Sequence, residues 1–406
     1  MHLLTNPLLR YRWGSGDLLQ RLLGVPTDGH PLAEVRIGAH GEESSQLIEG
    51  GHAVRLDRFV AAHPAATLGD AATRDGGRRL PFEARLLATR APLPLQVCPD
   101  ATQARVGHAR EEAAGVDAYA PQRLYPDDSA RPGLIHAFSG VRMLAGFRPV
   151  PAIHASLAGW DLSILAPIVS ALTQAGPGDE LLYALTTLLA SSATKQRQIA
   201  GGLARAAREH PEHPDAGLVT LLAEHHPGDV GVVLALLLNQ VRMEPGEVRY
   251  LPPGMIHGYL SGMGLELTAS SGNVVRAGLS LEHVDLRQVL RIAGLTVGEP
   301  PRLEAVPDGV ASVFASPAGD LGLWASPGAP GPVPGPAHGP RLVVCLHRWA
   351  PEADAGPGGR ATVSLTTDTG GMTLSTGQSA FVSAADGPLR VRSSGPVLVA
   401  HLPQAR

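Results

Sequence analysis

With 406 residues, 44% of them hydrophobic, the chain is long enough for two or three domains and too apolar to be a disordered protein. Its net charge of −4 argues against a polyanion-binding role, so we expect no nucleic-acid partner. Two cysteines without a disulfide framework, no recognisable signal peptide and no apolar run of about 18 residues predict a cytoplasmic protein without a membrane partner.

The first part of the chain, residues 1–151, alternates short apolar runs with Gly and Pro, as an all-β unit does. Within it we expect a short helix over 16–23, a strand over 33–40 and a strand over 81–88. The last of these leads directly into the apolar segment 93–100, which also has strand character.

Segment 93–100 carries Gln96 and Cys98, which are two residues apart and point to the same face of a strand. Two ligand-type side chains with this spacing are how a β-barrel lines its interior with a metal site. His257 follows a Pro-Pro-Gly turn on another predicted strand. We therefore expect these two segments to face each other across a barrel.

Between the strands, residues 152–240 show apolar positions at intervals of three and four, including a last predicted helix over 230–239. This pattern predicts a helical insertion between strands of one barrel, although a separate helical domain would give the same local pattern.

Strands return over 241–300, which would complete the first barrel with one helix over 284–292. Residues 301–340 are Pro- and Gly-rich and are expected to form a linker and the first strands of a further unit. Residues 341–406 contain regularly spaced short strands and predict a second, small jelly-roll barrel with a structural role.

Several short motifs, in this order along nearly the whole chain, resemble the type I mannose-6-phosphate isomerases of the cupin superfamily. They are Asn6-Pro7, Tyr11-x-Trp-Gly-Ser15, Ala33-Glu34, Gly38-Ala-His40, Pro81-Phe82, Leu95-Gln-Val-x-Pro99, Glu111-x-Ala-Ala-Gly115, Pro245-Gly246, His257-x-Tyr-Leu-x-Gly262 and Asn273-Val-x-Arg-Ala-Gly-Leu279. The resemblance implies a mainly β fold with an α insertion: cupin-type jelly-roll barrels (bicupin-like) plus a helical domain. It also implies carbohydrate metabolism, with zinc as cofactor, a small-molecule sugar phosphate or similar polar metabolite as partner, and a monomeric protein.

The family's zinc ligands carry over only in part. Gln96 and His257 match, but Cys98 stands where the family has a His, and Gly133 stands where it has a Glu. The candidate metal ligands are therefore Gln96, Cys98 and His257, and zinc binding is weakened by Cys98 and Gly133. The alternative is that Cys98 is a buried core thiol and His257 a satisfied polar residue.

Other pocket positions are also changed: Arg85 replaces a Lys of the family and Gly272 an Asp, whereas Arg276, expected to steady an enediolate, is kept. The candidate catalytic residues are Arg276, Arg131 and His257, and the candidate substrate-binding residues are Arg85, Arg36, Trp13 and Glu266. The four arginines would form a phosphate pocket, since arginine forks suit phosphate.

No single residue can be assigned as the base that transfers the proton. His257, His40, His136 and Glu266 are all candidates, and each alone could be structural. The first hypothesis is a sugar-phosphate isomerase with an altered metal site and reduced or changed activity. The alternatives are a repurposed cupin enzyme acting on another small polar or phosphorylated substrate, and a non-catalytic sugar-phosphate-binding relative.

Overall fold

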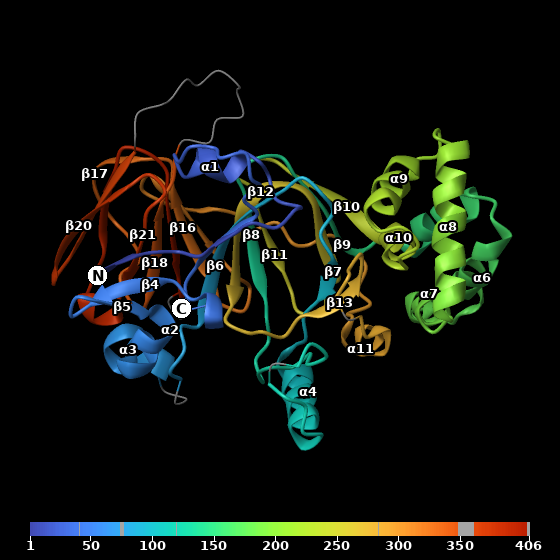
Figure 1. Cartoon of the computed structure of the whole chain (residues 1–406), viewed down its shortest axis with the longest axis horizontal. Helices are drawn as coiled ribbons and strands as arrows, with labels where there is room; N and C mark the ends of the chain where they lie inside the picture. Colours follow the sequence, from blue (N-terminus) through green and yellow to red (C-terminus); the bar gives the residue numbers. More distant parts are fainter. Residues whose placement is uncertain (40, 74–76, 119, 283, 348–360, 404–406) are drawn as a thin grey trace.

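The computed structural model describes residues 1–39, 41–73, 77–118, 120–282, 284–347 and 361–403. Figure 1 shows three parts in a row along the long axis: the C-terminal strands at one end, a central group of strands, and a bundle of helices at the other end. The candidate site lies in the central group.

The central group is a ten-stranded sheet organised around the long strand β12 (His257–Ala269). β12 pairs with four other strands, so side chains from distant segments meet along it. It bends at Gly262, whose φ of 118° favours glycine, next to a register shift between Tyr259 and Ser261. The other strands of the sheet are β2 (Leu8–Leu9), β3 (Glu34–Ile37), β6 (Phe82–Thr89), β7 (Leu95–Val97), β8 (Gly133–Ala137), β9 (Val141–Phe147), β10 (Leu238–Met243), β11 (Val248–Leu251) and β13 (Val275–Gly278).

The C-terminal strands form a seven-stranded and a four-stranded sheet, and one apolar core draws side chains from both. The first strand of the chain, β1 (His2–Leu4), also belongs here, because it pairs with β21 (Ser379–Val382). The remaining strands are β14 (Val306–Asp308), β15 (Ala311–Ala315), β16 (Gly322–Ser326), β17 (Ala329–Pro334), β18 (Arg341–Cys345), β19 (Thr362–Thr367), β20 (Gly370–Ser375), β22 (Arg390–Ser393) and β23 (Val397–His401).

The Pro- and Gly-rich residues 328–336, within the stretch expected to form a linker and first strands, mostly form the strand β17. This strand lies at the edge of the four-stranded sheet, where prolines that donate no backbone hydrogen bond are tolerated. Its register with β22 shifts between Ala329 and Val333, so the prolines leave few ladder positions unfilled.

The helical part stands between β9 and β10, which pair with each other. Its helices are α5 (Val150–Gly159), α6 (Ala166–Gln174), α7 (Glu180–Leu189), α8 (Ala193–Glu209), α9 (Ala216–His225) and α10 (Gly231–Leu234), with the 3-10 turns η2 (Ser163–Leu165) and η3 (Ala235–Leu237). The helix predicted to run to Asn239 ends earlier, because β10 begins at Leu238; the apolar run before it has no clear period. Among the described residues, no helix combines the length and apolar character needed to cross a membrane.

Smaller elements surround the central sheet: α1 (Leu18–Leu22), α2 (Leu56–Ala62), α3 (Pro64–Thr73), α4 (Ala101–Ala113), α11 (Leu286–Ile292), η1 (Gly41–Glu43), η4 (Ala384–Asp386) and the hairpin of β4 (Gln46–Glu49) and β5 (His52–Arg55). Helix α4 begins with a capping box in which Asp100 and Gln103 exchange hydrogen bonds. This cap fixes the chain directly after Cys98.

Candidate functional site

The candidate site is an inner cavity of about 160 Å³ in the central sheet. β12 contributes side chains at both ends of its length, β7 pairs with its first residue, and β13 pairs with β7. The cavity is lined by Arg36, Arg85, Gln96, Cys98, Arg131, Gly133, Leu251, His257, Glu266, Thr268, Val274 and Arg276. The cavity therefore brings together all of the candidate metal-ligating, catalytic and substrate-binding residues except Trp13.

Gln96 and His257 are direct neighbours. They are register partners on the adjacent strands β7 and β12, and Gln96 Nε2 lies 3.0 Å from His257 Nε2. The expectation that their segments face each other across a barrel is thus wrong in this detail. Gln96 Oε1 in turn accepts a hydrogen bond of 2.9 Å from Arg276. The two side chains form one hydrogen-bonded row with Arg276.

His257 is held in one neutral form by its contacts. Its Nδ1 lies 3.0 Å from the carbonyl oxygen of Met255 and donates to it, which leaves the lone pair of Nε2 to accept from the Gln96 amide. Burial lowers the pKa of His257, although the Met255 carbonyl opposes this. The ring is therefore neutral at pH 7, with a proton acceptor at Nε2.

Cys98 lies next to this row as a free, buried thiol. Burial raises its pKa to about 11. Across the cavity Gly133 offers no side chain, and a Cβ built on it would lie 3.3 Å from Thr268 Cγ2. A Cβ at position 133 would therefore need only a small shift of Thr268.

The interior of the sheet beside the cavity holds a buried ion-pair network around Arg85. Its guanidinium donates to Glu34 at 2.9 Å and to Glu266, which also accepts a hydrogen bond of 2.7 Å from Tyr259. Burial alone would lower the pKa of Arg85, but Glu266 and Glu34 outweigh it and raise that pKa. Burial likewise opposes the charge on Glu266, but Arg85 and the Tyr259 hydroxyl lower its pKa. Both groups are charged at neutral pH.

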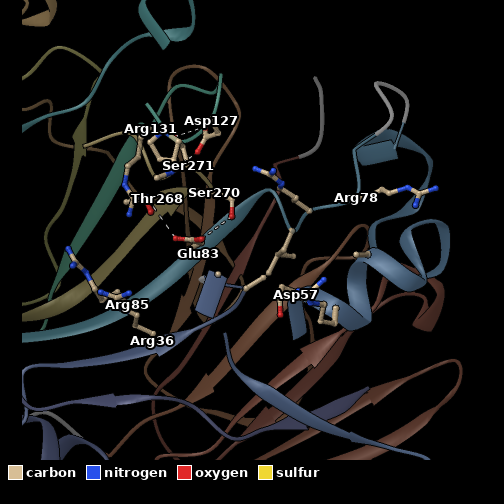
Figure 2. Close-up of a pocket in the computed structure, with 18 of the residues that line it drawn as sticks. Arg36, Asp57, Arg78, Glu83, Arg85, Asp127, Arg131, Thr268, Ser270 and Ser271 are labelled. Atoms are coloured by element: carbon tan, nitrogen blue, oxygen red, sulfur yellow. Dashed lines mark hydrogen bonds and ion pairs between the residues drawn. The ribbon is translucent and has the colours of Figure 1, made fainter. Parts of the chain in front are cut away.

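A larger, outer cavity of about 530 Å³ adjoins the inner one and shares Arg36, Arg85 and Arg131 with it. Figure 2 shows these three arginines on one side of the hollow. Arg36 bonds to Glu34 at 3.2 Å and to Glu43, whereas Arg131 has Glu83 at 3.9 Å, beyond hydrogen-bond distance. Arg131 is therefore the less engaged of these cations.

Two of the expected residues lie elsewhere. Trp13 stacks on Tyr11 with ring centroids 5.3 Å apart and lines neither cavity. His136 is buried in β8 beside Phe138 and Phe314, away from the cavities, and burial lowers its pKa to about 4. His40 lies outside the described residues.

Sequence reasoning missed the roles of Glu34 and Tyr259. Glu34 is two residues before Arg36 in β3, so strand alternation already places both on one face. Tyr259 is two residues after His257 in β12 and could have been placed beside it for the same reason. Their shared contact with the Arg85 network depends on strand order, which no local signal gives.

Comparison with known proteins identifies the family of this chain. Residues 1–150 match the family described as phosphomannose isomerase type I, catalytic domain. The mannose-6-phosphate isomerase of Salmonella typhimurium is 31% identical over 297 residues, which cover 71% of this chain and 74% of that protein. The chain belongs to the mannose-6-phosphate isomerase family. The resemblance inferred from the motifs is confirmed.

Other members of the mannose-6-phosphate isomerase family agree over a similar length. Mannose-6-phosphate isomerase 1 of Arabidopsis thaliana is 28% identical over 320 residues, covering 72% of this chain and 71% of that protein. A zinc-bound crystal structure of mannose 6-phosphate isomerase has a TM-score of 0.85 at 26% identity and covers 99% of both chains. The mixed α/β fold is therefore shared with solved members of the family.

The zinc named for that solved relative would meet a changed set of donors here. Gln96, Cys98 and His257 line the cavity and Gly133 adds no side-chain donor, while the lone pairs of Gln96 and His257 accept from Arg276 and Gln96. Among the described residues, no group of three or more His, Cys, Asp and Glu side chains is placed to hold a metal ion. Four arginines against one carboxylate in the inner cavity also disfavour a divalent cation.

Proposed function

We propose that the protein binds a sugar phosphate in the inner cavity and interconverts its aldose and ketose forms, with an altered metal centre. The proposal rests on one observation: Gln96, His257 and Arg276 line one cavity together with three further arginines, in a member of the mannose-6-phosphate isomerase family. Arginine forks suit phosphate, and a buried cation suits the charge that develops on an enediolate. Mannose 6-phosphate is the first substrate to test.

The isomerisation moves a proton between neighbouring carbons and needs a base beside them. We assign this role to His257, since it is neutral and its Nε2 carries a free lone pair once a substrate displaces the Gln96 amide. Arg276, which now donates to Gln96, would turn to the developing enediolate oxygens. Arg131, whose ion pair with Glu83 spans 3.9 Å, would bind the phosphate together with Arg85.

We infer that zinc binds more weakly here than in the zinc-bound relative. The support is the loss of a side-chain donor at Gly133 and the internal hydrogen bonds of Gln96 and His257. Cys98→His with Gly133→Glu should raise zinc content from well below to near one ion per chain, by elemental analysis of protein purified without chelator. Cys98→His alone is the control and should stay low. A full complement of zinc in the unmodified protein would refute the inference.

A second candidate function, non-catalytic binding of a sugar phosphate, is favoured by one observation. The three polar groups nearest the reaction centre, on Gln96, His257 and Arg276, already satisfy one another. Such a row recognises a ligand without needing a reaction, because its donors and acceptors only have to exchange partners.

One pair of measurements separates the two functions. Interconversion of mannose 6-phosphate and fructose 6-phosphate is followed by NMR, with added zinc and with chelator, beside the His257→Gln variant. Turnover that His257→Gln abolishes supports the isomerase. No turnover under any condition, together with a rise in melting temperature on adding mannose 6-phosphate, would replace it with the binding function.

We also propose that the central and C-terminal sheets are two cupin-type barrels in a monomeric protein. The domain limits would be 1–151 and 241–300 for the first barrel, 152–240 for the helical insertion, 301–340 for a linker with first strands, and 341–406 for the second barrel. The core between the C-terminal sheets, which draws no residue from the central sheet, supports the second barrel, whereas the helical part shares its core with the central sheet, as an insertion would.

A further inference from the structure

The outer cavity ends at arginines that the proposed isomerisation does not use. It encloses about 530 Å³, which is a size typical of small-molecule sites, against about 160 Å³ for the inner cavity. Figure 2 shows Arg36, Arg85 and Arg131 on one side of the hollow and Arg78 on the opposite side, with Glu83 between them. Arg78 is therefore separated across the cavity from the three arginines that the two cavities share.

The arginines that line only the outer cavity are Arg58, Arg78 and Arg79, and we call them the outer arginine group. Arg58 Nε lies 3.9 Å from Asp57, whose carboxylate is instead bonded by Arg55 at 2.8 and 2.9 Å. For Arg78 and Arg79 the described part of the chain contains no ion-pair partner. These three guanidinium groups are left with their charge available to a ligand.

The backbone that carries the outer arginine group is anchored. Arg58 lies in α2, which buries Leu56, Phe59 and Val60. Leu80, directly after Arg79, is fully buried in the core under the central sheet. The exposed guanidinium groups thus start from fixed positions at the rim, while their side chains stay free to adapt.

The charges in the outer cavity do not balance. Its lining has six arginines and four carboxylates. Asp127, one of the four, accepts hydrogen bonds from the backbone of Gly272 at 2.7 Å and from the Ser271 hydroxyl at 2.9 Å. Its carboxylate therefore holds the loop that contains these two residues. The cavity as a whole favours an anion, and the excess positive charge lies at the outer end.

We propose that the outer arginine group is a second anion subsite and that the ligand is a hexose carrying two phosphate groups, one at each end of the cavity. The proposal rests on the proposed function for the phosphate at Arg85 and Arg131, from which the sugar ring of the bisphosphate extends into the outer cavity rather than toward His257. Arginine forks bind phosphate with charge-assisted hydrogen bonds, and two such contacts separated by a sugar ring use both groups of cations at once.

Isothermal titration calorimetry with fructose 6-phosphate and fructose 1,6-bisphosphate tests the second subsite. We expect the bisphosphate to bind at least about tenfold more tightly, with an advantage that shrinks as salt rises because the outer group is exposed. Arg78→Gln with Arg79→Gln should bring the two affinities to within about twofold while leaving that for fructose 6-phosphate unchanged. The matched control, Arg390→Gln with Arg392→Gln on β22, removes two exposed arginines outside both cavities and should change neither affinity.

Each of the other possible results overturns the second subsite, the function proposed for the inner cavity, or both. Equal affinities in the unmodified protein, or an advantage that survives the Arg78 and Arg79 changes, would overturn the second subsite. If fructose 6-phosphate fails to bind while the bisphosphate binds and loses affinity in the double variant, the subsite stands and the function proposed for the inner cavity falls. Absence of binding by both sugars overturns both.

Discussion

The two β-rich parts of the molecule differ in what fills them. Between the C-terminal sheets lie Trp324, Leu365 and Leu374, all buried in one apolar cluster. The interior of the central sheet instead holds Arg85 with its carboxylates, beside a hollow. An apolar interior packs to the density of a crystal, whereas charged groups in a sheet interior must each find a partner. Only the second arrangement leaves polar groups that can exchange partners with a ligand.

The strongest way to break this contrast is to remove the carboxylate of Glu266. Glu266→Gln leaves Arg85 with Glu34 as its remaining carboxylate partner, and the loss should be about 3 kcal/mol, at the low end for breaking a buried pair, because Glu34 still compensates the charge and 21% of the Arg85 side chain is exposed. Urea unfolding should show this loss. Glu299→Gln, which removes an exposed partner of Arg249, is the control and should cost less than about 1 kcal/mol. Equal, small losses in both variants would mean that Arg85 is solvated rather than held by its network.

The converse change tests the apolar side. Leu374→Ala in β20 opens a cavity among tightly packed side chains and should lower the free energy of unfolding by about 3 kcal/mol. Because no ligand group lies there, the affinity for mannose 6-phosphate should stay the same at temperatures where the variant is folded. A parallel loss of affinity would show that the C-terminal sheets shape the site.

The sequence predicted much of this division, for a physical reason. Alternation along a strand and family motifs together placed Gln96, Cys98 and His257 around one cavity, and the positional comparison singled out Gly133. The order of the strands in the sheets could not be predicted from the sequence. That His257 lies beside Gln96 rather than opposite, and that β1 joins the C-terminal sheet, depends on pairings between segments far apart in the chain, for which no local pattern exists.

His136 lies where the two β-rich parts meet, against Phe138 and Phe314. Its burial there makes the stability of the protein depend on pH. Its pKa of about 4 in the folded protein is below the unfolded value of 6.5, so the unfolded state binds more protons as the pH falls through this range. Above pH 6.5 the ring is largely neutral in both the folded and the unfolded state, so its burial takes little from the free energy of unfolding. Between pH 7 and pH 5 the free energy of unfolding falls by about 2 kcal/mol on account of this ring.

His136→Leu should remove this share of the acid sensitivity. Urea unfolding at pH 7 and pH 5 would show the variant losing about 2 kcal/mol less than the unmodified protein. His210→Gln, on an exposed side chain, is the control and should leave the slope unchanged. An identical pH dependence with and without His136 would mean that the ring is protonated in the folded state at pH 5.

The smallest effect is expected at the rim of the inner cavity, where Arg276 also pairs with Glu282 at 2.6 Å. The Glu282 side chain is 65% exposed, so Glu282→Gln should change the free energy of unfolding by less than about 1 kcal/mol. It should nevertheless raise the affinity for mannose 6-phosphate about two- to fivefold at low salt, because one negative charge near the arginines is gone, and the gain should vanish as salt rises. Calorimetric titration at two salt concentrations measures both effects. Weaker binding would contradict this and would mean that Glu282 serves to hold Arg276 in the direction of the ligand, so that the charge matters less than the fixed geometry.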